Sequence, residues 1–156
     1  KPGEGTCFSV LFPLCSSGGS KPQAITDSAE RVLPVGDEKI LVVDDEEPVR
    51  NVLSKSLSHL GYQVEVAENG EQAIEKYVQT VGHYDLVILD MLMPQLSGEQ
   101  VFFSLKEHNP EVAVLVISGF TSEESVNRIL ENGGKGFIQK PFTIEALAKK
   151  VRECVE

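Results

Sequence analysis

The stretch Leu86-Val87-Ile88-Leu89-Asp90 decides the fold that this sequence can adopt. Four consecutive apolar residues leave no polar face, so a strand formed by them must be buried on both sides, as in a parallel sheet. An aspartate follows the run directly, and parallel sheets bind ligands beyond the carboxyl ends of their strands. The stretch therefore predicts a central strand that delivers a carboxylate to a binding site.

Four further apolar runs alternate with segments of helical periodicity. The runs cover residues 40–43, 64–67, 112–117 and 136–138. Between them, apolar residues recur three and four positions apart, as on the buried face of a helix. The first helical pattern is Val49, Val52, Leu53, Leu57 and Leu60, and the last is Ile144, Leu147, Ala148, Val151 and Val155. Five successive strand–helix units predict an α/β fold, an open five-stranded parallel sheet with helices on both faces.

Polar residues follow these runs at four strand ends. They are Asp44 and Asp45 with Glu46, then Asp90, then Ser118, then Lys140 with Pro141. Each alone has an ordinary explanation, because an aspartate can cap a helix, a serine can be a loop hydroxyl and a lysine can be solvated. Together they would crowd carboxylates whose charges, about 4 Å apart, repel by on the order of 4 kcal/mol. Mg²⁺ and the lysine would offset that repulsion, and this donor set predicts an aspartate that accepts a phosphoryl group.

The motifs at these strand ends resemble the receiver domain of response regulators in two-component phosphorelays. They read Val42-Val43-Asp44-Asp45-Glu46, Leu89-Asp90-Met91-Leu92-Met93-Pro94 with Gly98, Ile117-Ser118-Gly119, and Gln139-Lys140-Pro141-Phe142. The resemblance covers residues 38–156, which we take as the receiver domain. It implies a doubly wound five-stranded parallel sheet that is flavodoxin-like, with strand order 2-1-3-4-5.

The resemblance also implies how the acidic residues act. Asp90 would be the phosphoacceptor. Asp45 and Asp90 would ligate Mg²⁺ directly, together with the backbone carbonyl of Leu92, and Asp44 would act on the metal through water.

Further roles are implied for the fourth and fifth strand ends. Ser118 and Lys140 would contact the phosphoryl oxygens. Ser118 and Phe137 would form the conformational switch, although core packing alone would also account for Phe137. The peptide bond between Lys140 and Pro141 would be cis, a form that is accessible only before proline.

Two residues depart from common choices in the family. Leu92 and Phe120 are apolar at positions where polar residues are frequent, beside the path of the attacking water. Our hypothesis is that these bulky groups hinder hydrolysis and give the phosphoryl aspartate a long lifetime.

The first 37 residues are expected to lie outside the receiver. Residues 3–13 resemble the closing strand of a histidine-kinase ATP-binding domain, so residues 1–15 would be its remnant, with an arbitrary apolar strand as the alternative. Residues 16–37 contain a Ser-Ser-Gly-Gly-Ser-Lys-Pro stretch and predict a linker. This order suggests the C-terminal receiver of a hybrid sensor histidine kinase, and the fragment itself should have no kinase activity.

Charge and composition narrow the partners. The net charge of -10 argues against nucleic acid or an anionic membrane as a direct partner. The 3 cysteines match no zinc-site spacing and indicate free thiols in a reducing cytosol. We see no signal peptide and expect a cytoplasmic domain, which is compatible with a membrane-anchored parent.

Three functions stay open from the sequence. As a relay, the domain would take a phosphoryl group from a phosphohistidine on a histidine kinase dimerisation domain or a separate histidine phosphotransfer protein. It would catalyse its own phosphorylation and slow autodephosphorylation, without being a conventional turnover enzyme. A haloacid-dehalogenase-type phosphatase would use similar groups but needs an acid two residues after the nucleophile, where this chain has Leu92. The third is a receiver-like binding module that is not phosphorylated.

Overall fold

The computed structural model describes residues 33–80, 84–119 and 123–156. The described residues all belong to one compact unit, residues 32–156. The predicted kinase remnant at residues 1–15, most of the predicted linker and Phe120 lie outside the described residues.

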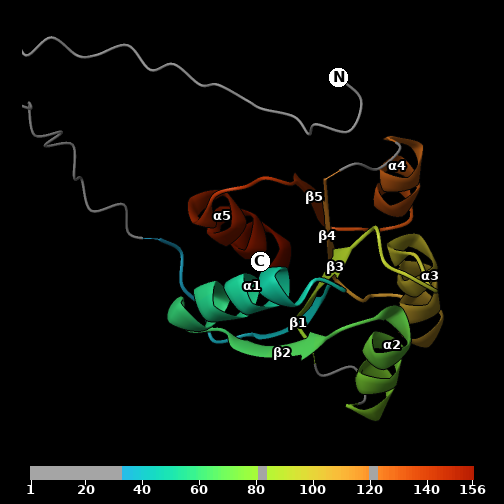
Figure 1. Cartoon of the computed structure of the whole chain (residues 1–156), viewed down its shortest axis with the longest axis horizontal. Helices are drawn as coiled ribbons and strands as arrows, with labels where there is room; N and C mark the ends of the chain where they lie inside the picture. Colours follow the sequence, from blue (N-terminus) through green and yellow to red (C-terminus); the bar gives the residue numbers. More distant parts are fainter. Residues whose placement is uncertain (1–32, 81–83, 120–122) are drawn as a thin grey trace, which may run out of the picture. The chain divides into compact units, whose positions relative to one another are not determined.

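Five parallel strands form one sheet in the order β2-β1-β3-β4-β5 (Figure 1). They are β1 (Lys39–Val43), β2 (Gln63–Ala67), β3 (Leu86–Asp90), β4 (Val114–Ser118) and β5 (Gly136–Gln139). This confirms the predicted doubly wound, flavodoxin-like topology. It also places β1 and β3, the two strands with aspartates at their ends, side by side.

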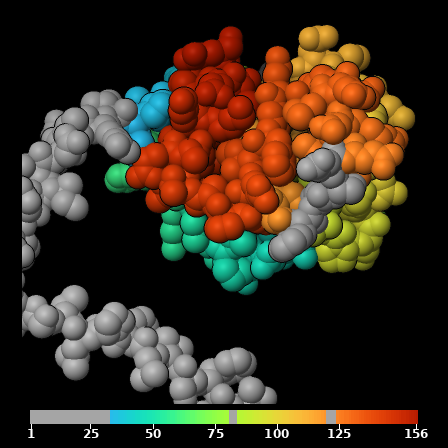
Figure 2. Space-filling model, turned by 90° about the horizontal axis from the view of Figure 1, so that it is seen from above, coloured from blue at the N-terminus to red at the C-terminus, as the bar shows by residue number. Residues whose placement is uncertain are grey.

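Helices cover both faces of the sheet (Figure 1). Helices α1 (Glu47–His59) and α5 (Ile144–Val155) pack on one face, and α2 (Gly70–Gln79), α3 (Gly98–His108) and α4 (Glu123–Glu131) pack on the other. In Figure 2 the red and orange atoms of the C-terminal part of the chain form most of the visible face. Among the described residues, no helix is both long enough and apolar enough to span a membrane.

Alternate residues of each central strand enter different cores. Leu41 and Val43 of β1 belong to the core under α2, α3 and α4, whereas Ile40 and Val42 belong to the core under α1 and α5. Strands β3 and β4 are buried at every position. A strand with a core on each side needs apolar residues at successive positions, which explains the unbroken runs in the sequence.

Strand β4 starts later than the apolar run that predicted it. The strand begins at Val114, because the backbone N–H of Val112 donates to the carbonyl of Asn109 at 3.1 Å and closes a turn there. Val112 is nevertheless buried, so its apolar side chain belongs to the core without belonging to the sheet.

The end of the predicted linker packs on the α/β domain. Leu33 contacts the core under α1 and α5, and the backbone N–H of Gly36 donates to the carbonyl of Leu60 at 3.1 Å. Arg152 of α5 donates to the carbonyl of Val35 at 3.3 Å. These contacts attach residues 33–36 to the α1 and α5 side of the sheet.

Candidate functional site

The sheet order brings the predicted polar residues to one edge. Asp44 follows β1, Asp90 ends β3 and Ser118 ends β4. Lys140 follows β5, and its backbone N–H donates to the carbonyl of Ser118 at 2.8 Å, which joins the ends of β4 and β5. Because all strands are parallel, these carboxyl ends meet at the same edge, as the sequence predicted.

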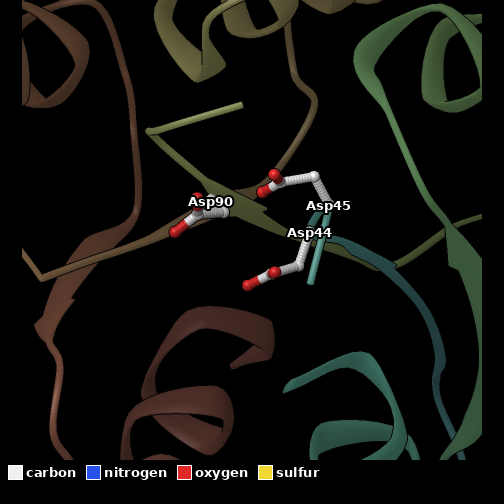
Figure 3. A group of neighbouring side chains, drawn as sticks. All are labelled: Asp44, Asp45 and Asp90. Atoms are coloured by element: carbon white, nitrogen blue, oxygen red, sulfur yellow. The ribbon is translucent and has the colours of Figure 1, made fainter. Parts of the chain in front are cut away.

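Three aspartates gather at the ends of β1 and β3 (Figure 3). One carboxylate oxygen from each of Asp44, Asp45 and Asp90 lies within 4.8 Å of the others. Asp44 is 1% exposed and Asp90 is 5% exposed, whereas Asp45 is open to solvent. The cluster therefore combines two buried carboxylates with one that faces water.

Lys140 bridges the two buried carboxylates. Its Nζ lies 2.8 Å from Oδ2 of Asp44 and 2.9 Å from Oδ1 of Asp90. Burial raises the pKa of Asp90 above its ordinary value, and the hydrogen bond and charge of Lys140 oppose that rise. Burial acts to lower the pKa of Lys140, but the hydrogen bonds and charges of both aspartates outweigh it and raise the pKa. The ammonium is therefore held charged where it neutralises the pocket.

The loop after β3 is folded tightly against Asp90. The backbone N–H of Leu92 donates to Oδ2 of Asp90 at 3.0 Å, and the N–H of Gly98 donates to the carbonyl of Met91 at 3.1 Å. A Cβ on Gly98 would lie 2.3 Å from the carbonyl oxygen of Asp90, so only glycine fits there. Helix α3 then starts with a capping box in which Ser97 is the N-cap residue.

The predicted switch residues occupy β4 and β5. Ser118 is buried at the end of β4. Phe137 on β5 is half-buried and packs against the core under α2, α3 and α4. The Lys140-Pro141 peptide bond is cis, the form that the family resemblance implied. These positions leave the switching roles of Ser118 and Phe137 as predictions.

Sequence reasoning missed one residue at the site, Arg50. Its Nη1 donates to the backbone carbonyl of Asp44 at 2.6 Å. A second contact at this corner, from the backbone N–H of Glu46 to Oδ1 of Asp44 at 2.9 Å, was also missed. The available signal was a basic residue in the first turn of α1, where a helix favours acidic residues.

The donor set fits a hard divalent cation. Asp44, Asp45 and Asp90 offer carboxylate oxygens, the ligand type that Mg²⁺ takes in proteins. The solvent-facing side of Asp45 leaves room for the water ligands that Mg²⁺ usually keeps. The residues present therefore suit the metal that the fold implies.

Solved structures share this fold. The response regulator receiver domain protein from Clostridium thermocellum has a TM-score of 0.72 and 26% sequence identity, over 76% of this chain and 94% of that chain. The chemotaxis protein CheY4 of Vibrio cholerae has a TM-score of 0.70 and 28% identity, over 76% of this chain and 99% of that chain. Fold and site together define a flavodoxin-like signalling domain of the two-component type.

The family follows from the sequence comparison. The family model described as response regulator receiver domain matches residues 40–152. The chain belongs to this family, and its function is phosphoryl-accepting signalling.

The curated relatives are longer than this chain. Sensor kinase CckA of Brucella abortus is 27% identical over 159 residues, which is 99% of this chain and 17% of the relative. Response regulator MprA of Mycolicibacterium vanbaalenii is 35% identical over 114 residues, which is 73% of this chain and 48% of the relative. The chain thus spans less than half of the length of either relative.

Proposed function

We propose that Asp90 accepts a phosphoryl group from a phosphohistidine. A carboxylate oxygen of Asp90 attacks phosphorus, the bond from phosphorus to the histidine nitrogen breaks, and the nitrogen keeps the bonding electrons. The observation that carries the proposal is the position of Lys140 Nζ, 2.9 Å from Asp90 Oδ1 and 2.8 Å from Asp44 Oδ2. An ammonium so placed can neutralise charge on the incoming phosphoryl oxygens.

The acidic cluster is the proposed Mg²⁺ site. Asp45, Asp90 and the backbone carbonyl of Leu92 would hold the ion directly, and Asp44 would act through water. Bound Mg²⁺ supplies the positive charge that three neighbouring carboxylates and a phosphoryl group require. The N–H of Leu92, at 3.0 Å from Oδ2 of Asp90, keeps the acceptor carboxylate oriented.

The proposed output is a shift between two populations of the domain. Ser118 at the end of β4 would move toward the phosphoryl group, and Phe137 on β5 would turn inward. The half-buried position of Phe137 is compatible with both orientations.

We propose that this receiver is part of a hybrid sensor histidine kinase. The match to sensor kinase CckA includes 99% of this chain, whereas the match to MprA includes 73%. The additional aligned residues support a kinase-type protein that continues before the receiver. The phosphodonor would be a histidine kinase dimerisation domain or a histidine phosphotransfer protein, on the cytoplasmic side of the membrane if the parent is anchored.

Intact-mass spectrometry after incubation with acetyl phosphate and Mg²⁺ tests the proposal. Wild type should gain one phosphoryl group, and Asp90→Asn should gain none. Asp37→Asn is the matched control, because Asp37 is exposed and outside the cluster, and it should be labelled like wild type. An unlabelled wild type would point to a binding module, and steady turnover of p-nitrophenyl phosphate would point to a phosphatase.

A further inference from the structure

The backbone carbonyl of Asp44 lies at a point where the sheet no longer supplies a partner. Strand β1 ends at Val43, and the last bond of its ladder is from the N–H of Asp44 to the carbonyl of Ala67 at 3.3 Å. Asp44 is only 1% exposed, so its carbonyl needs a donor from the protein. Arg50 supplies that donor, with Nη1 at 2.6 Å.

Arg50 occupies an unfavourable position for a cation. Helix α1 begins at Glu47 after the N-cap residue Glu46, so Arg50 lies in its first turn. The N-terminal end of a helix carries partial positive charge and favours acidic residues. The hydrogen bond to Asp44 gives the guanidinium a specific role there, which a solvated surface residue would not have.

The bond from Arg50 restrains the peptide unit that leads into Asp45. The carbonyl of Asp44 and the N–H of Asp45 belong to one planar peptide unit, so holding the carbonyl also holds the start of Asp45. The carboxylate of Asp44 is fixed separately, by the N–H of Glu46 on Oδ1 and by Lys140 on Oδ2. Arg50 therefore holds the backbone that joins the exposed Asp45 to its buried neighbour.

We propose that Arg50 is a positioning residue for the divalent-cation site, through the peptide unit between Asp44 and Asp45. The inference rests on the proposed function, because it assigns Mg²⁺ to the aspartate cluster. Residues that orient metal ligands change metal affinity by roughly 10–100-fold when they are removed. Arg50 acts through a neutral carbonyl and not through the carboxylates, so we expect an effect of about tenfold, at the lower end of that range.

The direction in which Mg²⁺ affinity changes when Arg50 is replaced distinguishes a positioning role from a simple effect of its charge. Removing a positive charge near an acidic cluster should tighten Mg²⁺ binding if charge alone matters. Removing the donor to Asp44 should weaken binding, because the ligands lose their alignment. Arg50→Met keeps most of the aliphatic side chain and removes both charge and donor, so the two explanations predict opposite results.

Isothermal titration calorimetry of the full chain with Mg²⁺ provides the test, with folding checked by circular dichroism. Arg50→Met should weaken Mg²⁺ binding about tenfold, and Arg50→Lys, which keeps the charge and one donor group, should lie between it and wild type. Arg128→Met is the matched control, because the ion pair of Arg128 is with Glu99 on α3, and its loss should leave the affinity unchanged.

The outcomes are distinguishable. Equal or tighter binding by Arg50→Met, with wild type binding Mg²⁺ normally, would overturn the role of Arg50 and leave the proposed function intact. A wild-type protein that neither binds Mg²⁺ nor takes up a phosphoryl group would overturn the proposed function as well. If Arg50→Met does not fold, Arg50→Lys decides, since positioning predicts weaker binding and an unchanged affinity contradicts it.

Discussion

Replacing Lys140 with methionine should destabilise the metal-free domain strongly. The substitution keeps a long side chain but removes the ammonium that lies 2.8 Å from Asp44 and 2.9 Å from Asp90. Both carboxylates are almost fully buried, at 1% and 5% exposure. The variant therefore leaves two neighbouring buried carboxylates without their shared counter-charge.

The expected magnitude follows from the burial of the three side chains. Removing one partner of a buried ion pair costs about 3–5 kcal/mol, because the other charge stays buried and unpaired. The side chain of Lys140 is 21% exposed, so its ion pairs are not fully shielded from water. We therefore expect a loss near the lower limit, about 3 kcal/mol of unfolding free energy, at a pH where both carboxylates are ionised.

The loss should depend on pH in a defined direction. Burial already raises the pKa of Asp90 in the folded wild type, and removing Lys140 takes away the group that opposes this rise. A carboxyl whose pKa is higher in the folded state than in the unfolded state favours folding at low pH. That contribution is lost as the pH rises through the folded pKa. The difference between Lys140→Met and wild type should therefore be small at acidic pH and grow toward alkaline pH.

Mg²⁺ should reverse part of the deficit. A ligand present at 100 times its dissociation constant stabilises the folded state by about 2.7 kcal/mol. Lys140→Met lacks the ammonium that competes with a cation for the same carboxylates. Saturating Mg²⁺ should therefore raise its unfolding free energy by more than it raises that of wild type.

Urea unfolding followed by far-ultraviolet circular dichroism measures these differences, because the chain has no tryptophan for fluorescence. Lys149→Met is the matched control, because Lys149 is an exposed lysine of α5 and its loss should change little. A Lys140→Met variant as stable as wild type at alkaline pH without Mg²⁺ would show that the ammonium does not neutralise the buried aspartates, and our reasoning would be wrong.

Three further predictions concern Gln95, the pair of Glu38 with Arg152, and the two apolar residues Leu92 and Phe120. Gln95 has a positive φ of 70°, which strains a residue with a side chain, so Gln95→Gly should raise the unfolding free energy by about 0.5–1 kcal/mol in urea titrations. The hydrogen bond from Arg152 lowers the pKa of Glu38 in the folded protein. The pair therefore stabilises the fold at pH values above the pKa that Glu38 has in the unfolded chain. This contribution disappears as the pH falls through the lowered pKa of the folded protein. Glu38→Gln should thus have a lower melting temperature than wild type at neutral pH, and the difference should vanish in acid; a constant difference would contradict this assignment. Replacing Leu92 with Asn and Phe120 with Glu should speed the decay of the phosphoryl label in a mass-spectrometric time course, and an unchanged decay would remove the hypothesis of a hindered water path.

The fold was predictable from the sequence because the sheet has a core on each face. Both faces of β3 and β4 are buried, so their apolar runs are unbroken and easy to detect. Reading an unbroken apolar run as a strand placed the start of β4 too early. Val112 is apolar and buried but lies in a turn, and its sequence pattern does not distinguish it from a residue of the strand. Val52 and Ile144 fit helical spacing but are 61% and 47% exposed, because spacing alone does not fix the limits of a buried stripe.

The site was predictable in part, for a topological reason. Each aspartate, and Ser118 and Lys140, lies within two residues of the end of an apolar run, and parallel strands bring such ends together. Arg50 lies six residues beyond Asp44 inside a helical pattern, and a single arginine there resembles a solvated surface residue. A cation near the start of a helix is an unusual choice, but its target is a backbone carbonyl, which has no sequence signature, so the sequence does not connect the two.

In the proposed switch, only strands β4 and β5 separate the phosphorylation pocket from Phe137. Lys140 forms ion pairs with both buried carboxylates. An added phosphoryl group would change the number of negative charges around this ammonium. The backbone N–H of Lys140 donates to the carbonyl of Ser118 at 2.8 Å. In the proposed switch, a shift of either side chain toward the phosphoryl group would therefore act on the paired ends of β4 and β5. Phe137 lies three residues before Lys140 on β5 and packs against the core under α2, α3 and α4. In the proposed switch, the charge balance of the pocket would bias the position of Phe137 through the neighbouring strands β4 and β5.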